Sequence, residues 1–169
     1  MGIKSTNGIV FRGLVQKDIA LLEKWYGMKD QFGYATGFKN FLEIKQKLLE
    51  PIKPDALISM IDIAEDNKTI GFIYGEFKKT GSKTILWIHI LIVEPAYQRR
   101  GLGTSAVNKL LQDVKLYHRP LTCIAAVSEK NIPGLSFWSK VGFTRSESME
   151  ESLYQLGTSN VAIFQKAIT

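Results

Sequence analysis

The chain has 169 residues, a formal charge of +6 at pH 7, 45% hydrophobic residues and 22% charged residues. These values are ordinary for a soluble globular protein, and the length predicts one domain, residues 1–169, with a sizeable core. Lysine and arginine are spread along the chain instead of gathered in blocks. The charge therefore favours a small anionic ligand, and we expect no nucleic-acid partner.

The cysteine count and the apolar runs exclude further classes of protein. Cys123 is the only cysteine, which excludes an internal disulfide and a multi-cysteine metal site, so we expect no metal. Its place in the apolar run over 121–127 predicts a buried structural thiol rather than a nucleophile. Residues 1–7 are polar and lack the apolar segment of a signal peptide, and no apolar run is long enough to cross a membrane. We expect a cytoplasmic protein with no membrane partner.

The first third of the chain predicts one strand and two helices. A strand is predicted over 8–15, and Asp18 is a plausible N-cap for a helix that ends near Gly27. The aromatic and glycine-rich stretch over 31–37 is predicted as a mobile loop or short turn. Asn40 and Glu43 have the spacing of a capping box, which predicts the start of a second helix.

The rest of the chain predicts a meander followed by a crossover. Strands are predicted over 56–64, 69–77 and 84–93, and the short turns between them imply antiparallel pairing. We then expect a helix from 101 to about 117, a strand over 121–127, a helix over 132–140, and closing strands over 143–152 and 160–168. The order β-α-α-β-β-β-α-β-α-β-β predicts an α/β (α+β) fold: a mixed, mostly antiparallel sheet of six to seven strands with flanking helices.

A connection rich in charge and glycine follows the strand over 84–93. It reads VEPAYQRRGLGT from Val93 to Thr104, and helical spacing of apolar residues begins at Leu102. A helix that opens with glycines has backbone N–H groups without partners, and its dipole adds positive potential there. Arg99 and Arg100 add fork-shaped donors. These residues, 93–104, are called the elbow below. They favour a phosphate-bearing ligand over a loop that merely allows close packing.

Two other phosphate motifs compete for the same glycines. Residues 101–106 (GLGTSA) match the dinucleotide pattern G-x-G-x-x-G/A, with Glu129 near the end of the next strand. In a dinucleotide site the first glycine follows the strand almost at once, whereas seven residues separate Val93 from Gly101 here. The meander is also wrong for a doubly wound sheet. A Walker-type loop fails because no Gly-Lys-Ser/Thr follows.

Two motifs in register resemble the GCN5-related N-acetyltransferase (GNAT) family. Residues 98–103 (QRRGLG) fit the family signature Q/R-x-x-G-x-G/A, preceded by the Val-x-Pro that commonly leads into it. Residues 131–143 (NIPGLSFWSKVGF) resemble the family segment N-x-x-A-x-x-F-Y-x-K-x-G-F, at the right distance from the first motif. The predicted order of elements also resembles that of the family over nearly the whole chain.

The resemblance implies the GNAT-like acyl-CoA N-acyltransferase fold, with acetyl-CoA (coenzyme A) as acyl donor. In this family the donor lies in a V-shaped opening between two parallel strands that splay apart, here those over 84–93 and 121–127. The implied cofactor-binding residues contact the pantetheine arm through the strand backbone (Leu91, Ile92, Val93), hold the pyrophosphate in the elbow (Gln98, Arg99, Arg100, Gly101, Leu102, Gly103, Thr104), or line the arm from the second motif (Asn131, Gly134, Trp138).

The chemistry implied is attack of a primary amine on the thioester, so the amine must lose a proton to a base or a water chain. His89 lies on the central strand where many relatives carry a glutamate, and it is the candidate base or water relay. The alternative is a histidine held in an apolar strand by a hydrogen-bonded partner. A backbone N–H at a strand bulge near Leu91 or Val93 would stabilise the oxyanion.

The sequence departs from the family at Trp138, where relatives carry the general-acid tyrosine. Indole cannot protonate a thiolate, so a nearby tyrosine or water takes the role, or the protein does not catalyse transfer. The acid is therefore unassigned. Packing against Phe137 and Phe143 would account for the tryptophan.

Family members bind the acceptor between the first two helices and the far strands. The aromatic residues there could hold an amine through cation–π contact or form core: Trp25, Tyr26, Phe32, Tyr34 and Phe38. We therefore predict an N-acetyltransferase acting on the primary amine of a small molecule or peptide, with a homodimer compatible with this assignment. The alternatives are a non-catalytic CoA-binding module and, further off, a dinucleotide-dependent oxidoreductase.

Overall fold

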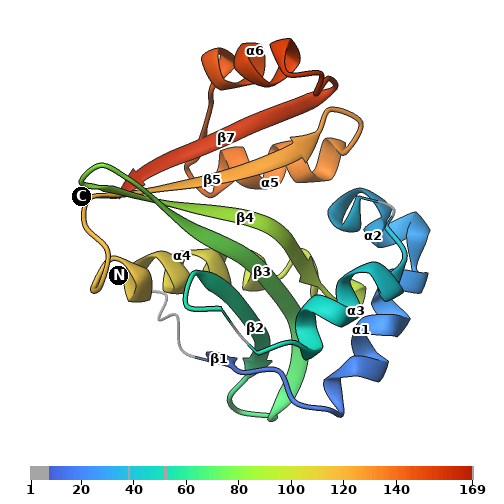
Figure 1. Ribbon diagram of the computed structural model, residues 1–169. Coiled ribbons are helices and arrows are strands. Elements are labelled where there is room, and N and C mark those ends of the chain that lie inside the picture. The colour runs from blue at the N-terminus through green and yellow to red at the C-terminus, as the bar shows by residue number, and fades with distance from the viewer. Residues whose placement is uncertain (1–7, 38, 52, 169) are drawn as a thin grey trace.

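The computed structural model of the protein describes residues 8–37, 39–51 and 53–168. Two sequence expectations lie outside these residues: the polar start of the chain, residues 1–7, and Phe38 in the acceptor site. The described strands form one seven-stranded sheet in the order β1-β2-β3-β4-β5-β7-β6 (Figure 1). They are β1 Ile9–Arg12, β2 Ala56–Ile63, β3 Lys68–Thr80, β4 Lys83–Val93, β5 Leu121–Ser128, β6 Thr144–Arg145 and β7 Val161–Ile168.

The sheet is mixed and mostly antiparallel, as the sequence predicted. Strands β1 to β4 pair antiparallel with their neighbours along the chain, and β7 pairs antiparallel with both β5 and β6. Only β4 and β5 pair in parallel among the described strands. One parallel pair beside a meander is not the doubly wound sheet of a dinucleotide domain.

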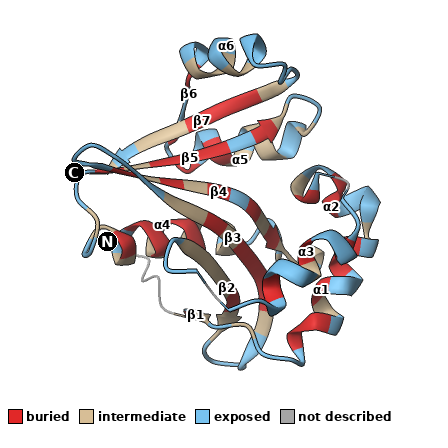
Figure 2. Cartoon of the chain, in the orientation of Figure 1, coloured by how far each residue is buried: buried red, intermediate tan, exposed pale blue. Residues whose placement is uncertain are grey.

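Helices cover both faces of the sheet. They are α1 Asp18–Gly27, α2 Lys29–Thr36, α3 Phe41–Leu49, α4 Leu102–Val114, α5 Ile132–Lys140 and α6 Glu147–Gln155, with one turn of 3-10 helix, η1 Pro95–Tyr97, before α4. One core packs α1, α2 and α3 against β2, β3 and the end of β4. A second packs α4 and α5 against β4, β5 and β7, and these two appear as the buried faces in Figure 2. A third, smaller cluster packs α4 against β1, β2 and β3.

Strand β4 changes the face to which its buried side chains point. Leu86 and Ile88 lie in the core beneath α4 and α5, whereas Ile90 and Ile92 lie in the core beneath α1–α3. Regular alternation would keep all four on one face. The strand therefore contributes its first half to one core and its second half to the other.

A β-bulge at His89 causes this change of face. On β3, Gly75 pairs with Ile88 and Tyr74 pairs with Ile90, so His89 is an extra residue without a partner in the register. The bulge was expected near Leu91 or Val93, and this expectation is wrong. Its position fits the close approach at Gly75, where an added Cβ would lie 2.5 Å from the backbone oxygen of Trp87.

Strands β4 and β5 separate immediately after this bulge. Their parallel pairing begins at Thr84 and ends at Ile88, opposite Ala125. Residues 90–93 of β4 then pair with β3 alone, and residues 126–128 of β5 pair with β7 alone. The facing edges of the two strands are open from this point, and Figure 1 shows the strands diverging. The predicted V-shaped opening is present, with His89 at its vertex.

Two stretches have a different secondary structure from the prediction. Residues 31–37, predicted as a loop or turn, lie largely in α2, which buries Phe32 and ends at Gly37 with a left-handed φ of 65°. The hydroxyl of Thr36 donates to the Phe32 carbonyl at 3.0 Å. Burial of one aromatic ring and a glycine C-cap stabilise a helix that its glycine and polar residues alone would not favour.

The strand predicted over 143–152 is mostly a helix. Only β6, Thr144–Arg145, is extended, and α6 follows with Ser146 as its N-cap, whose hydroxyl accepts from the Met149 N–H. A serine cap followed by Glu147 and Glu150 is a helix start signal that the sequence contains. Strand β6 is so short that it pairs only with Phe164 and Gln165 of β7. The next backbone N–H of β7, that of Ile163, donates to the Glu150 carboxylate of α6 at 3.3 Å instead. In this way α6 covers an edge that a longer strand would have paired.

Asp18 is the first residue of α1 and not its N-cap, which is Lys17. Its carboxylate is buried and accepts from Val15 N–H at 2.8 Å and from both terminal nitrogens of Arg12 at 2.8 Å. Arg12 also donates to Asp62 at 2.7 Å and to Thr69 at 2.9 Å. The residue predicted as a local cap is therefore part of an ion network that joins β1, β2, β3 and α1.

Candidate functional site

The elbow turns sharply between β4 and α4. Arg99 and Gly101 have left-handed backbone angles, with φ of 61° and 76°. Left-handed residues within a turn bring successive backbone N–H groups to one side, which is an arrangement that binds anions. The side-chain amide of Gln98 donates to the Val93 carbonyl at 2.7 Å and closes the turn. Gln98 thus contributes to the shape of the elbow, while the N–H groups that follow it remain for a ligand.

The first turn of α4 consists of Leu102, Gly103 and Thr104, whose N–H groups have no partner within the helix. Gly103 lies in a tight place: an added Cβ would lie 3.2 Å from a ring carbon of Phe137 and 3.7 Å from a methyl of Val93. The helix start therefore lies against both β4 and α5. Phe137 borders this turn. The sequence alone did not identify Phe137 as a site residue.

Additional positive charge surrounds the elbow. The Lys68 ammonium lies 5.2 Å from the centroid of the Tyr97 ring, and the Arg100 guanidinium lies 5.5 Å from the same centroid. Cations at these distances interact with the ring face. Lys68 begins β3 and is far from the elbow in sequence, so only the fold brings it here. The helix dipole and these side chains together favour an anionic group at the start of α4.

Asn131 and Gly134 of the second motif form the N-terminus of α5. The side-chain oxygen of Asn131 accepts from the Gly134 N–H at 3.1 Å and caps the helix. A Cβ on residue 134 would collide with the Asn131 side chain. Both residues therefore lie at one helix start, as the motif spacing indicated.

Trp138 is buried, with 6% of its surface exposed. Its ring packs edge-on against Phe137 and Phe143, with centroid distances of 5.1 and 4.8 Å. The packing explanation accounts for this residue, and an indole N–H is too weak an acid to protonate a thiolate. The position that carries the acid in relatives is thus filled by core.

Leu91, Ile92 and Val93 form the open part of β4. Ile92 is fully buried beneath α1–α3, and Leu91 packs on the core beneath α4 and α5. The side chains of Leu91 and Ile92 pack in the two cores, so these two residues can offer only backbone groups to the opening. The strand-like contact with the pantetheine arm that the resemblance implied for these residues stays a prediction.

His89, at the vertex of the opening, lies in a cluster of polar and aromatic side chains. Its Nε2 is 3.6 Å from the Glu76 carboxylate, and the Tyr74 hydroxyl donates to the other carboxylate oxygen at 3.1 Å. The imidazole lies nearly parallel to the Trp87 indole, at a centroid distance of 6.4 Å and an interplanar angle of 7°. Glu76 and Tyr74 were not identified from sequence, because they come from the neighbouring strand.

The Glu76 side chain is ionised in this cluster. Partial burial raises the pKa of its carboxyl. The hydrogen bond from Tyr74 and the interaction with His89 lower this pKa by more, so the net shift is downward. Burial and the contact with Glu76 raise the pKa of Tyr74, which keeps its hydroxyl a donor. The cluster therefore presents a carboxylate, supported by a phenol, to one nitrogen of the histidine.

The predicted acceptor aromatics are mostly core residues. Trp25, Tyr26 and Phe32 are 0%, 4% and 3% exposed, while Tyr34 is 44% exposed. Among the described residues, the Trp25 indole nitrogen and the Tyr26 hydroxyl are buried without a hydrogen-bond partner. Burial, together with the nearby Tyr74, raises the pKa of the Tyr26 hydroxyl. Tyr26 of α1 thus borders the cluster around His89.

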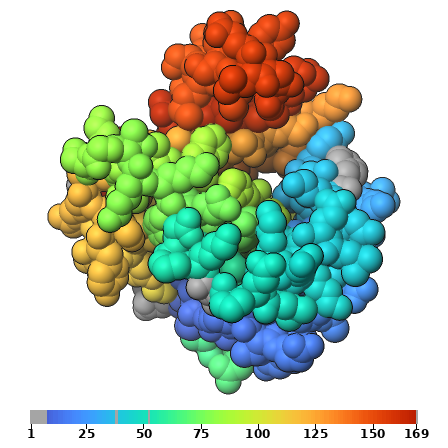
Figure 3. Space-filling model, in the orientation of Figure 1, coloured from blue at the N-terminus to red at the C-terminus, as the bar shows by residue number. Residues whose placement is uncertain are grey.

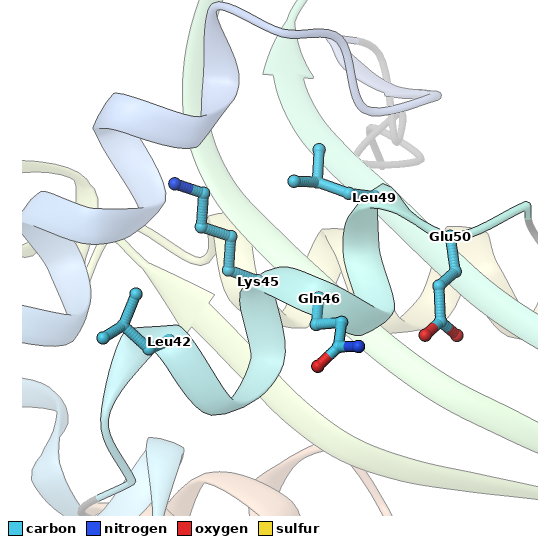
Figure 4. Close-up of a pocket in the computed structure, with 5 residues that line it drawn as sticks. All are labelled: Leu42, Lys45, Gln46, Leu49 and Glu50. Atoms are coloured by element: carbon cyan, nitrogen blue, oxygen red, sulfur yellow. The ribbon is translucent and has the colours of Figure 1, made fainter.

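The surface is hollowed where this cluster and the V-shaped opening meet. Figure 3 shows the hollow between the segment of β5, the end of β4 and the helices near the N-terminus. Helix α2 lies beside both β4 and β5 and forms one wall. A separate groove runs along α3, lined by Leu42, Lys45, Gln46, Leu49 and Glu50 (Figure 4). All five come from α3 and its C-cap, so no other element brings polar groups into that groove.

Cys123 lies in β5 and is fully buried. Burial raises the pKa of its thiol to about 12, which agrees with a structural thiol rather than a nucleophile. The described part of the chain holds no group of three or more His, Cys, Asp or Glu side chains that could bind a metal ion. Its helices are all too short or too polar to cross a membrane.

Fold and site together define a class: an α/β protein whose central parallel strands open beside a helix that begins at a left-handed glycine. The family model described as the acetyltransferase (GNAT) family matches residues 22–143, which is more than two thirds of the chain. The protein belongs to this family. The match includes the elbow, both strands of the opening and the second motif.

Solved structures of low sequence identity share the fold. A spermidine N-acetyltransferase from Vibrio cholerae, in complex with CoA and spermine, is 13% identical with a TM-score of 0.70, covering 95% of each chain. RimL, a ribosomal alpha-N-protein acetyltransferase in complex with coenzyme A, is 12% identical with a TM-score of 0.72, covering 95% of this chain and 94% of that one. A protein of Arabidopsis thaliana in complex with a bisubstrate analogue is 15% identical with a TM-score of 0.66, covering 95% and 98%. No curated protein sequence matches the chain.

Proposed function

We propose that the protein is an acetyl-CoA-dependent N-acetyltransferase that transfers an acetyl group to the primary amine of a small molecule or peptide. The observation that carries this proposal is the separation of β4 from β5 directly after Ile88. Strand β4 then leads into the elbow, where Arg99 and Gly101 have left-handed backbone angles. Family membership supports the reaction class. Neighbours of the same fold, solved with CoA, with spermine or with a bisubstrate analogue, support the donor and the kind of acceptor.

The geometry divides the donor among three parts of the opening. The N–H groups of the elbow, Arg99 to Thr104, suit the pyrophosphate, and the cations around Tyr97 add charge there. The free edge of residues 89–93 suits the amides of the pantetheine arm, as an additional strand would. With the donor bound in this way, we expect the thioester near the vertex at His89 and the acceptor on the other side of it.

The residues around the vertex have two tasks in the reaction. His89 accepts the proton that the amine must lose, directly or through a water molecule. A backbone N–H at the bulge, where β4 leaves its regular pairing with β3, is available to stabilise the developing oxyanion. Acetyl-CoA supplies the activated acyl group. Trp138 cannot protonate the departing thiolate, so we expect water to do so.

Binding and turnover are tested separately. Gly103→Glu adds a carboxylate to the phosphate site and a Cβ against Phe137, so we expect CoA to bind at least about tenfold more weakly, roughly 1.4 kcal/mol. Gly27→Glu is the matched control, because its Cβ meets nothing within 4 Å. The measurement is calorimetric titration with CoA. Equal affinity in wild type and Gly103→Glu would contradict the assignment of the elbow.

Thiol release from acetyl-CoA on a panel of polyamines and peptide N-termini then tests transfer. Acetylation of an amine by wild type, lost in His89→Ala, is the expected result. Binding of CoA without thiol release on any amine would favour the alternative, a non-catalytic CoA-binding module. The core tryptophan at position 138 is the observation that keeps this alternative in view.

A further inference from the structure

We propose that Glu76 is a positioning residue for His89: its carboxylate holds the imidazole in the tautomer that leaves Nδ1 free to take the proton of the acceptor amine. This inference rests on the proposed function for its chemical meaning. The pairing itself is a statement about two side chains and can be tested without turnover.

The bulge in β4 creates the contact. Because His89 is the extra residue opposite the Tyr74–Gly75 step, its side chain emerges on the same face as Trp87, beside the residues of β3 that face α1–α3. Its Nε2 faces Glu76 Oε2 at 3.6 Å, and its ring lies 5.5 Å from that of Tyr74. A regular strand without the bulge would turn residue 89 or residue 90 to the other face.

The two carboxylate oxygens of Glu76 have separate partners. Oε1 accepts the Tyr74 hydroxyl at 3.1 Å, which fixes the carboxylate plane, and Oε2 is left for the histidine. The 3.6 Å separation is an ion-pair distance, longer than a good hydrogen bond. Catalytic hydrogen bonds in ligand-free proteins are often long and shorten when substrate binds. The nearly parallel Trp87 ring limits the orientation of the imidazole from the other side.

A carboxylate beside Nε2 determines which nitrogen can act as base. The neutral ring places its proton on the nitrogen that has an acceptor, here Nε2, so Nδ1 carries the lone pair. When Nδ1 takes the amine proton, the ring becomes an imidazolium and the full charge of Glu76 faces it. One N–H bond of the ammonium breaks and one N–H bond forms at Nδ1, and the amine nitrogen keeps its electron pair for the thioester.

Stability does not explain this pair of side chains. Both are more than a third exposed, 38% for His89 and 37% for Glu76. Exposed ion pairs contribute about 0–1 kcal/mol to folding. The other titratable groups that face them are Lys78, which acts on Glu76, and Asp55, which acts on Tyr74; Tyr74 in turn acts on the buried Tyr26. The Glu76 carboxylate, which Tyr74 supports, therefore contributes little to folding. Its position at the vertex of the opening suits the orientation of a histidine instead.

Another role for Glu76 would be direct binding of the acceptor as an ammonium ion. In that case removing the carboxylate would raise the KM for the amine and leave both kcat and the histidine tautomer unchanged. Positioning predicts the opposite pattern. The two roles therefore give different results in the same variant.

The test compares full-length wild type with Glu76→Gln, whose side chain has the same shape without the charge. The chain has two histidines, so ¹⁵N-histidine labelling with a His118→Asn variant for assignment gives resolved imidazole signals. We expect wild-type His89 to show a protonated Nε2 and an unprotonated Nδ1. In Glu76→Gln we expect this preference to be lost or reversed, because the amide can donate to Nε2. Glu147→Gln, on the exposed α6, is the matched control and should keep the wild-type signals.

Turnover gives the second measurement. Glu76→Gln should lower kcat by about 10²-fold or more, since a wrongly oriented base loses most of its contribution. The KM for acetyl-CoA should stay within about twofold, because the elbow is untouched. Tyr74→Phe, which removes only the hydroxyl that fixes Glu76, should lower kcat by several-fold.

Unchanged imidazole signals in Glu76→Gln would overturn the proposal, as would a rise in the KM for the amine at constant kcat. The imidazole signals decide the pairing even if wild type acetylates no amine on the panel. Thiol release by wild type alone decides the proposed function, so the two failures are distinguishable.

Discussion

Two clusters of charged side chains on this sheet have similar members and opposite surroundings. At Arg12, all five guanidinium N–H groups have acceptors: Asp62, Thr69, the Gly13 carbonyl and both oxygens of Asp18. The Asp18 side chain is 3% exposed. At His89, one nitrogen faces a carboxylate at 3.6 Å and more than a third of each side chain is open to solvent.

The difference separates a cluster that holds the fold from one that is available for chemistry. The Arg12 cluster joins three strands to the first helix, and its guanidinium has no N–H left for a ligand. Among the described residues, Asp62 Oδ1 is a buried atom of this cluster that has no hydrogen-bond partner. The His89 cluster has a supported carboxylate, an imidazole whose Nδ1 has no hydrogen-bond partner among the described residues, and an opening beside it. Saturation and burial therefore indicate stability, whereas incomplete pairing at a hollow indicates function.

The largest expected effect is on the buried cluster. Asp18→Asn keeps the shape but removes the charge that faces both terminal nitrogens of Arg12, so we expect a loss of about 3 kcal/mol in the free energy of unfolding. Urea denaturation followed by circular dichroism measures it. Asp66→Asn, in the exposed turn before β3, is the control and should change stability by less than about 0.5 kcal/mol. A loss below about 1 kcal/mol in Asp18→Asn would show that the cluster is not structural.

The same cluster should make stability depend on pH. Burial raises the pKa of the Asp18 carboxyl, but the hydrogen bonds from Arg12 and Val15 and the Arg12 charge lower it more, so the folded-state pKa lies below the ordinary value. The unfolded chain therefore binds this proton first as the pH falls. The stabilisation is complete above the ordinary aspartate range, near pH 4, and is lost as the pH falls through the folded-state pKa.

Urea denaturation across this range should show wild type losing stability more steeply than Asp18→Asn below about pH 4. The stability difference between the two proteins should shrink as the solution becomes more acidic. Parallel pH profiles would mean that another carboxylate carries the acid dependence.

The sequence predicted what is encoded locally. The elbow and the second motif are runs of neighbouring residues, and the opening follows from the order of strand, helix and strand around them. His89 was identified from its position on the central strand, where many members of the family carry a glutamate. The position of the bulge was predicted wrongly, because it depends on the close approach of Gly75 to β4, a contact between strands.

The missed residues share one physical cause, which is that their partners are distant in the chain. Asp18 has the spacing of a helix cap, and the arginine that claims its carboxylate comes from β1. In the sequence Glu76 is an ordinary charged residue, and only the pairing of β3 with β4 brings it close to His89. Lys68 likewise reaches the elbow only through the fold. Helix α6 is the exception, since its serine cap and acidic first turn are local signals that the apolar run over 160–168 outweighed.

The smallest expected effect is the one that sharpens the comparison most. Glu76→Gln should change the free energy of unfolding by less than about 0.5 kcal/mol, because an exposed pair at 3.6 Å contributes little. Asp113→Asn is a matched measurement: it breaks the exposed Lys109–Asp113 pair on α4, 2.9 Å apart and remote from the opening, and should also lose less than about 0.5 kcal/mol. The two variants should differ only in turnover, which Glu76→Gln lowers and Asp113→Asn leaves unchanged. A loss of 2 kcal/mol or more in Glu76→Gln, about the scale of a buried pair, would place the His89 cluster with Arg12 among the structural ones, and the distinction drawn from exposure and saturation would not hold.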